Sequence, residues 1–126
     1  MPGPWPSVMA DRRARERWGR RAEQIAAIWL IAKGYRLLAR RVQTPGGEID
    51  LVMRRADALV FVEVKARATL DSGLAALHPA AQRRCQAAAR WLSPRFGWPG
   101  AAIRHDAVLI RPWALPRHLI GIWRDE

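Results

Sequence analysis

The sequence predicts a single α/β domain in which helices flank a central mixed β-sheet of four to five strands. Its 126 residues fit one domain, and half of them are hydrophobic, which is enough for a packed core. Segments with helical and strand periodicity follow one another in the order helix, three strands, helix, and one or two further strands. The first ten residues hold three prolines and are expected to form a flexible arm, so the domain spans residues 11–126.

A long first helix is expected over residues 11–33. Gly34 follows directly and is the residue type that commonly ends a helix. The first turns carry six arginines, which we interpret as a solvated face, with a phosphate-facing surface as the alternative. Steps of four and three along this helix predict one apolar stripe, made of Trp18, Ala22, Ile25, Trp29 and Ala32.

Three strands are expected next, over residues 35–42, 48–54 and 59–65. A Thr-Pro-Gly-Gly turn at 44–47 separates the first two. A short connection joins the second and third strands, which predicts a β-hairpin.

The C-terminal half is expected to add a helix and two strands. After a loop or irregular segment at 66–78, a helix over 79–92 begins with proline in its first turn, a favoured position. Strands are expected at 104–111 and, shorter, at 118–124.

The register of the hairpin follows from packing. A two-residue loop at 56–57 makes one face wholly aliphatic, and a slip of one residue would mix the two faces. On the other face, Asp50 then lies opposite Glu63, and Glu48 lies opposite Lys65. The aliphatic face collects Ile49, Leu51 and Met53 from one strand and Val60, Val62 and Val64 from the other.

Two opposed carboxylates indicate a metal site. Two such charges repel by about 4 kcal/mol at about 4 Å and an effective dielectric constant of about 20. A divalent cation reverses that sign, and Mg²⁺ (or Mn²⁺) accepts carboxylate, water and phosphate oxygens. Asp50 and Glu63 are therefore the expected metal ligands, and Lys65 is expected to orient or deprotonate water or to neutralise phosphate charge. The alternative is a cross-strand ion pair between Glu48 and Lys65 on a solvated face.

The charge balance points to a polyanionic partner. The chain carries 22 basic and 11 acidic residues, for a formal net charge of +11. Nucleic acid is the first partner to consider, and an anionic membrane surface is the second. Cys85 is the single cysteine, which agrees with a cytoplasmic protein, and the longest apolar run is too short to span a bilayer.

Several residues are expected to have structural roles. The three histidines at 78, 105 and 118 lack metal-ligand spacing and are expected on the surface or in loops. Asp106 is expected to pair with a neighbouring arginine. Packing is the favoured role for Trp91, Trp98 and Trp113, with base stacking as the alternative.

Four blocks of sequence resemble the YraN family of small bacterial proteins. They are Trp-Gly-Arg-Arg-Ala-Glu at 18–23, Lys-Gly-Tyr at 33–35, Gly-Glu-Ile-Asp-Leu-Val at 47–52 and Leu-Val-Phe-Val-Glu-Val-Lys-Ala-Arg at 59–67. The resemblance runs from about residue 19 to residue 92, with a weaker echo at 104–108. It implies the restriction-endonuclease-like PD-(D/E)xK fold, which is shared by restriction enzymes and archaeal Holliday-junction resolvases.

The resemblance also implies roles for individual residues. Asp50 matches the metal-binding aspartate, and Glu63 and Lys65 match the E-x-K pair, which Glu48 accompanies. Glu23 resembles a first-helix glutamate that completes the site in relatives, and an ion pair with Arg20 is the alternative. The family often has asparagine at position 41 and lysine at 81, where this chain has Arg41 and Ala81. The expected nucleic-acid contacts are Arg20, Arg67, Arg83 and Arg84.

Three functions remain open on the sequence. The first hypothesis is a metal-dependent endonuclease that hydrolyses phosphodiester bonds of DNA, with branched or damaged DNA among the candidate substrates. The second is a non-catalytic nucleic-acid-binding module with the same fold. The third is docking on anionic membranes through the arginine-rich first helix, although its apolar stripe more simply packs on the sheet. A homodimer is suggested by fold analogy alone, since junction-cutting relatives are often dimers.

Overall fold

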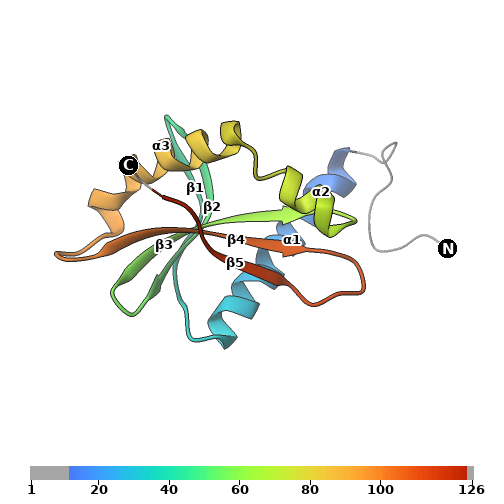
Figure 1. Ribbon diagram of the computed structural model, residues 1–126, viewed down its shortest axis with the longest axis horizontal. Helices are drawn as coiled ribbons and strands as arrows, with labels where there is room; N and C mark the ends of the chain where they lie inside the picture. Colours follow the sequence, from blue (N-terminus) through green and yellow to red (C-terminus); the bar gives the residue numbers. More distant parts are fainter. Residues whose placement is uncertain (1–11, 125–126) are drawn as a thin grey trace.

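Residues 12–124 are described by a computed structural model in which helices lie on both faces of a five-stranded sheet (Figure 1). The arm expected over residues 1–10 lies outside this part of the chain. The elements are α1 (Arg12–Ala32), β1 (Arg36–Thr44), β2 (Gly47–Arg55), β3 (Ala58–Ala66), α2 (Leu70–Ala75), α3 (Pro79–Phe96), β4 (Ala102–Ile110) and β5 (Arg117–Trp123).

The strands form one mixed sheet in the order β1-β2-β3-β4-β5. Strands β3 and β4 are parallel, and the other neighbouring pairs are antiparallel. The connection between the parallel strands contains α2 and α3, because a parallel pair needs a long crossover. The predicted fold class is thus confirmed, although the segment at 66–78 contains the short helix α2 and α3 extends to Phe96.

Helix α1 packs on the sheet through its smaller side chains. Trp18 and Trp29 are only half-buried and Ala32 is exposed, so the predicted stripe was wrong at these positions. Alanine lets the helix approach the sheet closely, and the indoles then lie at the flanks of the contact. The fully buried residues of α1 are Ala22, Ala26, Ala27 and Leu30.

The two faces of the sheet carry separate hydrophobic clusters. The cluster under α1 includes Leu51, Met53, Val60 and Val62. The cluster under α3 includes Val52, Leu59 and Phe61 from the sheet and Cys85 and Leu92 from the helix. The polar residues of β2 and β3 lie at the ends of these strands that extend beyond the two hydrophobic clusters.

The β2–β3 hairpin has the predicted register over its first half. Arg55 pairs with Ala58 across a two-residue loop, and the ladder continues to the pair Leu51–Val62. The ladder ends at that pair, so the predicted pairing of Glu48 with Lys65 is not part of it. Ile49 packs under α3 and not with Leu51 and Met53, so its predicted face was wrong. The strict alternation of β2 is lost because the residues of this strand before Leu51 are separated from β3.

A buried polar network joins β4 to β5. Asp106 is fully buried and accepts hydrogen bonds from Arg104 Nε and Nη2 at 2.9 Å, from His118 Nε2 at 2.8 Å and from the Gly121 N–H at 2.9 Å. Burial raises the pKa of Asp106, but the hydrogen bonds from His118 and Arg104 outweigh it, so the pKa is lowered. The predicted arginine pair is confirmed.

The histidine predictions were wrong at two of three positions. His105 is 1% exposed, and the side chain of His118 is 2% exposed because it lies between Asp106 and Lys33. His78 is exposed, and its ring accepts the Ala81 N–H at the start of α3. Among the described helices, none has the length and apolar character needed to cross a bilayer.

Candidate functional site

Asp50 lies where β2 separates from β3. The regular ladder ends at the pair Leu51–Val62, and Asp50 Oδ2 accepts a hydrogen bond from the backbone N–H of Val64 at 2.8 Å. A side-chain carboxylate therefore satisfies the backbone donor of β3 after the regular ladder has ended. The register that pairs Leu51 with Val62 places Asp50 level with Glu63.

Asp50 is surrounded by other acids. Burial raises its pKa to about 7, and the negative charges of Glu63 and Glu23 act in the same direction. The hydrogen bond from Val64 and the charge of Lys65 oppose this shift without cancelling it. Near neutral pH the Asp50 carboxyl is therefore divided between its protonated and ionised forms.

Glu63 is buried, and basic groups hold it on one side. It is 5% exposed, and its Oε1 atom lies 3.0 Å from Lys65 Nζ and 3.3 Å from Arg84 Nη2. Its Oε2 atom accepts a hydrogen bond from the Cys85 thiol at 3.2 Å. Burial, followed by the charge of Glu63, raises the pKa of Cys85, so this thiol is a donor and not a nucleophile. The partner of Lys65 is thus Glu63, and not Glu48 as the ion-pair alternative proposed.

A second group of acids faces Asp50 from α1 and β2. Glu23, Glu48 and Asp50 each offer a carboxylate oxygen, and these atoms lie within 4.8 Å of one another. All three residues are half-buried. Glu63 is outside this group of three, so Asp50 is the residue that both sets of acids approach.

Arg41 forms an ion pair with one acid of this second group. Its Nε atom lies 2.7 Å from Glu23 Oε2, which replaces the Arg20 pair considered from sequence. The hydrogen bond to Glu23 is the main cause that raises the pKa of Arg41, and the charges of Glu48 and Asp50 add to it. Arg41 also has φ +50°, a left-handed conformation that arginine adopts at a cost. No sequence pattern indicated this strain, although the asparagine that the family resemblance implies here tolerates it well.

Of the four arginines expected to bind nucleic acid, Arg84 and Arg20 lie beside the acids of the site, and Arg83 and Arg67 have other surroundings. Arg84 contacts Glu63, and its side chain packs against Gly47, where a Cβ atom would lie 2.5 Å from Arg84 Cγ. Arg20 lines surface hollows together with Glu23 and Arg41. Arg83 is exposed on α3, and the half-buried Arg67 donates to the carbonyl of Ala66 at 2.8 Å.

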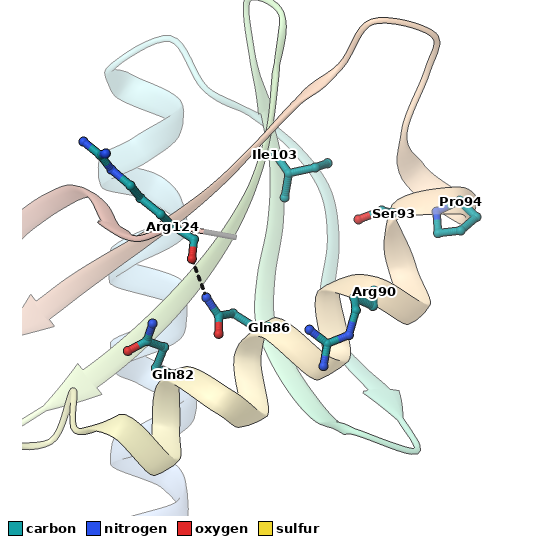
Figure 2. Close-up of a pocket in the computed structure, with 7 residues that line it drawn as sticks. All are labelled: Gln82, Gln86, Arg90, Ser93, Pro94, Ile103 and Arg124. Carbon is teal, nitrogen blue, oxygen red and sulfur yellow. Dashed lines mark hydrogen bonds between the residues drawn. The ribbon is translucent and has the colours of Figure 1, made fainter. Parts of the chain in front are cut away.

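A separate pocket of about 600 Å³ lies between α3 and the β4–β5 edge of the sheet (Figure 2). It contains none of the acids around Asp50. Gln86 Nε2 donates to the carbonyl oxygen of Arg124 across it at 2.8 Å. Its lining residues are Gln82, Gln86, Arg90, Ser93, Pro94, Ile103 and Arg124.

Comparison with known proteins gives the family. The model of the uncharacterised protein family UPF0102 matches residues 22–110. The chain belongs to the UPF0102 family. This confirms the resemblance to the YraN family, which is the same group, and the matched region contains Glu23, Glu48, Asp50, Glu63 and Lys65.

Individual UPF0102 proteins are similar over nearly their whole length. One from Rhodopseudomonas palustris strain BisB18 is 52% identical over 118 residues, covering 92% of this chain and 87% of the relative. One from Paramagnetospirillum magneticum is 44% identical over 118 residues, covering 90% and 92%. One from Rhizorhabdus wittichii is 43% identical over 118 residues, covering 94% of this chain and all of the relative.

Proposed function

We propose that this UPF0102 protein is a metal-dependent endonuclease that hydrolyses phosphodiester bonds of DNA. The observation that carries this proposal is the convergence of acids on Asp50, with Glu63 on one side and Glu23 and Glu48 on the other. Such a cluster costs folding free energy, because each carboxylate disfavours ionisation of the next. A fold keeps it more readily when a cation neutralises it.

The donor set fits Mg²⁺ or Mn²⁺. All the donors are hard carboxylate oxygens, and Mg²⁺ binds through one or two carboxylates plus water and phosphate oxygens. Asp50 and Glu63 would hold the ion, with Glu23 and Glu48 beside it. When bound, the ion would polarise a phosphodiester and acidify a coordinated water.

Lys65 would act on the phosphate as a charged donor. Its ammonium lies 3.0 Å from Glu63 Oε1, and its side chain is 19% exposed. Its contact with a carboxylate favours a role in neutralising charge on a phosphate oxygen over a role as the base that accepts a proton from water. Glu63 holds that ammonium in place.

The basic surface would supply affinity for DNA. The net charge of +11 attracts polyanions, and Arg84 and Arg20 border the acids. Arg67 and Arg83 extend the basic character at the end of β3 and the start of α3. Such contacts fix the position of the backbone without reading sequence. The single cysteine and a DNA substrate fit the cytoplasm as the place of action.

The direct test is cleavage of a panel of labelled DNAs, including duplex, nicked, forked and four-way-junction forms, with Mg²⁺ or Mn²⁺. The wild type should cut at least one form, and Asp50→Asn and Lys65→Met should each abolish cutting. Asp57→Asn is the matched control, because Asp57 is an exposed acid in the distant β2–β3 loop. Cleavage that survives both site changes would assign the activity to a contaminant.

A non-catalytic DNA-binding module is the second candidate. The observation that favours it is the pairing of Glu63 with Lys65 and Arg84, which leaves this acid 5% exposed and largely neutralised. This candidate predicts salt-sensitive DNA binding that Asp50→Asn leaves intact, together with no cleavage of any DNA in the panel.

A further inference from the structure

The loop between β4 and β5 presents a tryptophan to solvent. Trp113 is 86% exposed and Leu115 is 72% exposed. Of the three tryptophans whose role the sequence left open, Trp98 is half-buried against Arg54, with the guanidinium carbon 4.0 Å from the ring centroid. Packing does not explain Trp113 in the same way, and tryptophan is a residue type that is enriched at contact surfaces.

The backbone holds this ring outward at a cost. Trp113 has φ +60°, which is an outlier for a bulky residue. Pro112 and Pro116 bracket the loop tip and fix φ at two more positions. Strain of this kind persists where the surrounding structure enforces it, and it gathers at functional positions. The conformation of Trp113 therefore indicates that its exposed ring has a functional role.

The loop lies at the end of the sheet that carries the candidate site. In the parallel β3–β4 register, Lys65 is level with Leu109, and the loop begins at Arg111, two residues later. Figure 1 shows the β4–β5 loop and α2 at the end of the sheet towards which β3 runs. Strand geometry limits the Cα distance from Lys65 to Trp113 to about 15 Å, the length of roughly four base steps.

The charged residues of the loop and of the strand segments beside it are basic. Arg111 and Arg117 flank Trp113, and residues 107–124 contain no aspartate or glutamate. Within residues 12–124, neither arginine forms an ion pair. The Nε atom of Arg111 is buried and has no hydrogen-bond partner there. This composition complements a phosphate backbone, and the segment offers no acid to the basic side chains of a protein partner.

We propose that Trp113 stacks on an unpaired base of DNA bound at the Asp50 site, while Arg111 and Arg117 contact the flanking phosphates. A tryptophan can cover a base only where the face of that base is free, as at a fork, flap or junction. The substrate class is therefore DNA with an unstacked base within about four steps of the phosphate that Lys65 would contact. This inference rests on the proposed function only in taking DNA as the ligand.

The test is a binding titration of the full chain without divalent metal, so that no cleavage intervenes. The probes are a forked duplex with 2-aminopurine at the unpaired position and a fully paired duplex closed by hairpins. Trp113→Ala should weaken forked-DNA binding roughly 5- to 150-fold, the range that stacking supplies per base, and change paired-duplex binding much less. Trp113→Phe should retain most of the affinity.

Trp91→Ala is the matched control, because Trp91 is a 60% exposed tryptophan on α3. It should leave both affinities unchanged. The 2-aminopurine signal should be quenched by the wild type and not by Trp113→Ala. Thermal unfolding checks that both variants are folded.

Equal binding of forked DNA by the wild type and Trp113→Ala would overturn the proposal. Two other results would also overturn it if DNA binding is unchanged by Trp113→Ala. A change in sedimentation that depends on Trp113 would assign the loop to contact with a second copy of the chain, and a change in binding to anionic vesicles would assign it to lipid. A wild type that binds forked DNA through Trp113 but never cuts it would refute the nuclease and leave this inference standing.

Discussion

Replacing Asp50 with asparagine should stabilise the metal-free protein at pH 8. In the folded state, burial and the charge of Glu63 raise the pKa of Asp50 from 3.8 to about 7. Each pKa unit corresponds to about 1.4 kcal/mol, so the ionised carboxylate costs the fold about 4 kcal/mol at pH 8. Asparagine removes this charge, and its side-chain oxygen can still accept the Val64 N–H.

The sign of the effect fixes its pH dependence. A raised pKa means that the folded state holds the proton more tightly, so the contribution of Asp50 to wild-type stability is most favourable at low pH and falls as pH rises towards 7. With the two pKa values 3.8 and about 7, the cost is about 2 kcal/mol at pH 5 and about 4 kcal/mol at pH 8. The advantage of Asp50→Asn should therefore grow by roughly 2 to 3 kcal/mol between pH 5 and pH 8.

Urea unfolding of both proteins at pH 5 and pH 8, in the presence of a chelator, measures this directly. Asp57→Asn again serves as the control, because its exposed carboxylate should give no such growth. The reasoning is refuted if Asp50→Asn is no more stable than the wild type at pH 8. An advantage of equal size at both pH values would also refute it.

Three further substitutions test the local structure by thermal or chemical unfolding. In about 1 M NaCl, which screens the lost ion pair with Glu23, Arg41→Asn should stabilise by about 0.5 to 1 kcal/mol because asparagine tolerates φ +50°, whereas Arg40→Asn should not; a loss larger than that of Arg40→Asn contradicts this. Gly47→Ala should cost at least about 1 kcal/mol, because φ is +138° and the new Cβ would clash with the side chain of Arg84. Gly19→Ala, on an open surface of α1, should instead stabilise the protein by about 0.5 to 1 kcal/mol. Equal effects of the two substitutions would contradict this explanation. Asp106→Asn should cost about 3 to 5 kcal/mol by leaving the donors of Arg104 and His118 poorly paired, and a loss below about 1 kcal/mol would show that the network is dispensable.

The parts of the fold that sequence predicted are those that local rules determine. The pairing of Arg55 with Ala58 follows from a two-residue loop between alternating strands, and the structure has it. The same rule failed at Ile49, because β2 leaves β3 once the Asp50 carboxylate captures the Val64 N–H. This hydrogen bond is a tertiary interaction, and strand periodicity does not predict tertiary interactions.

Helix α1 and the histidines show a second limit. Periodicity selected Trp18 and Trp29 as core because they fall on the stripe at steps of four and three. The fully buried positions are instead mostly alanines, such as Ala26, since close approach to the sheet requires small side chains. His118 is hidden by the partners that surround it, and those partners come from elements that only the fold brings together. Spacing along the chain cannot reveal such a network.

For the candidate site, sequence supplied the residues and the structure supplied their partners. The assignment of Asp50 and Glu63 as metal ligands remains a prediction. The structure adds that Glu23 and Glu48 approach Asp50 from the other side and that Arg41 binds Glu23. These contacts depend on how α1 crosses β1 and β2, which no local pattern specifies.

Anomalous diffraction from crystals grown with Mn²⁺ at pH 8 tests the central claim most directly. Our account predicts a manganese peak about 2.1 Å from carboxylate oxygens of both Asp50 and Glu63, which disappears in Asp50→Asn crystals. Crystals without a peak at Asp50, in which Glu63 keeps its contacts with Lys65 and Arg84, would contradict the account.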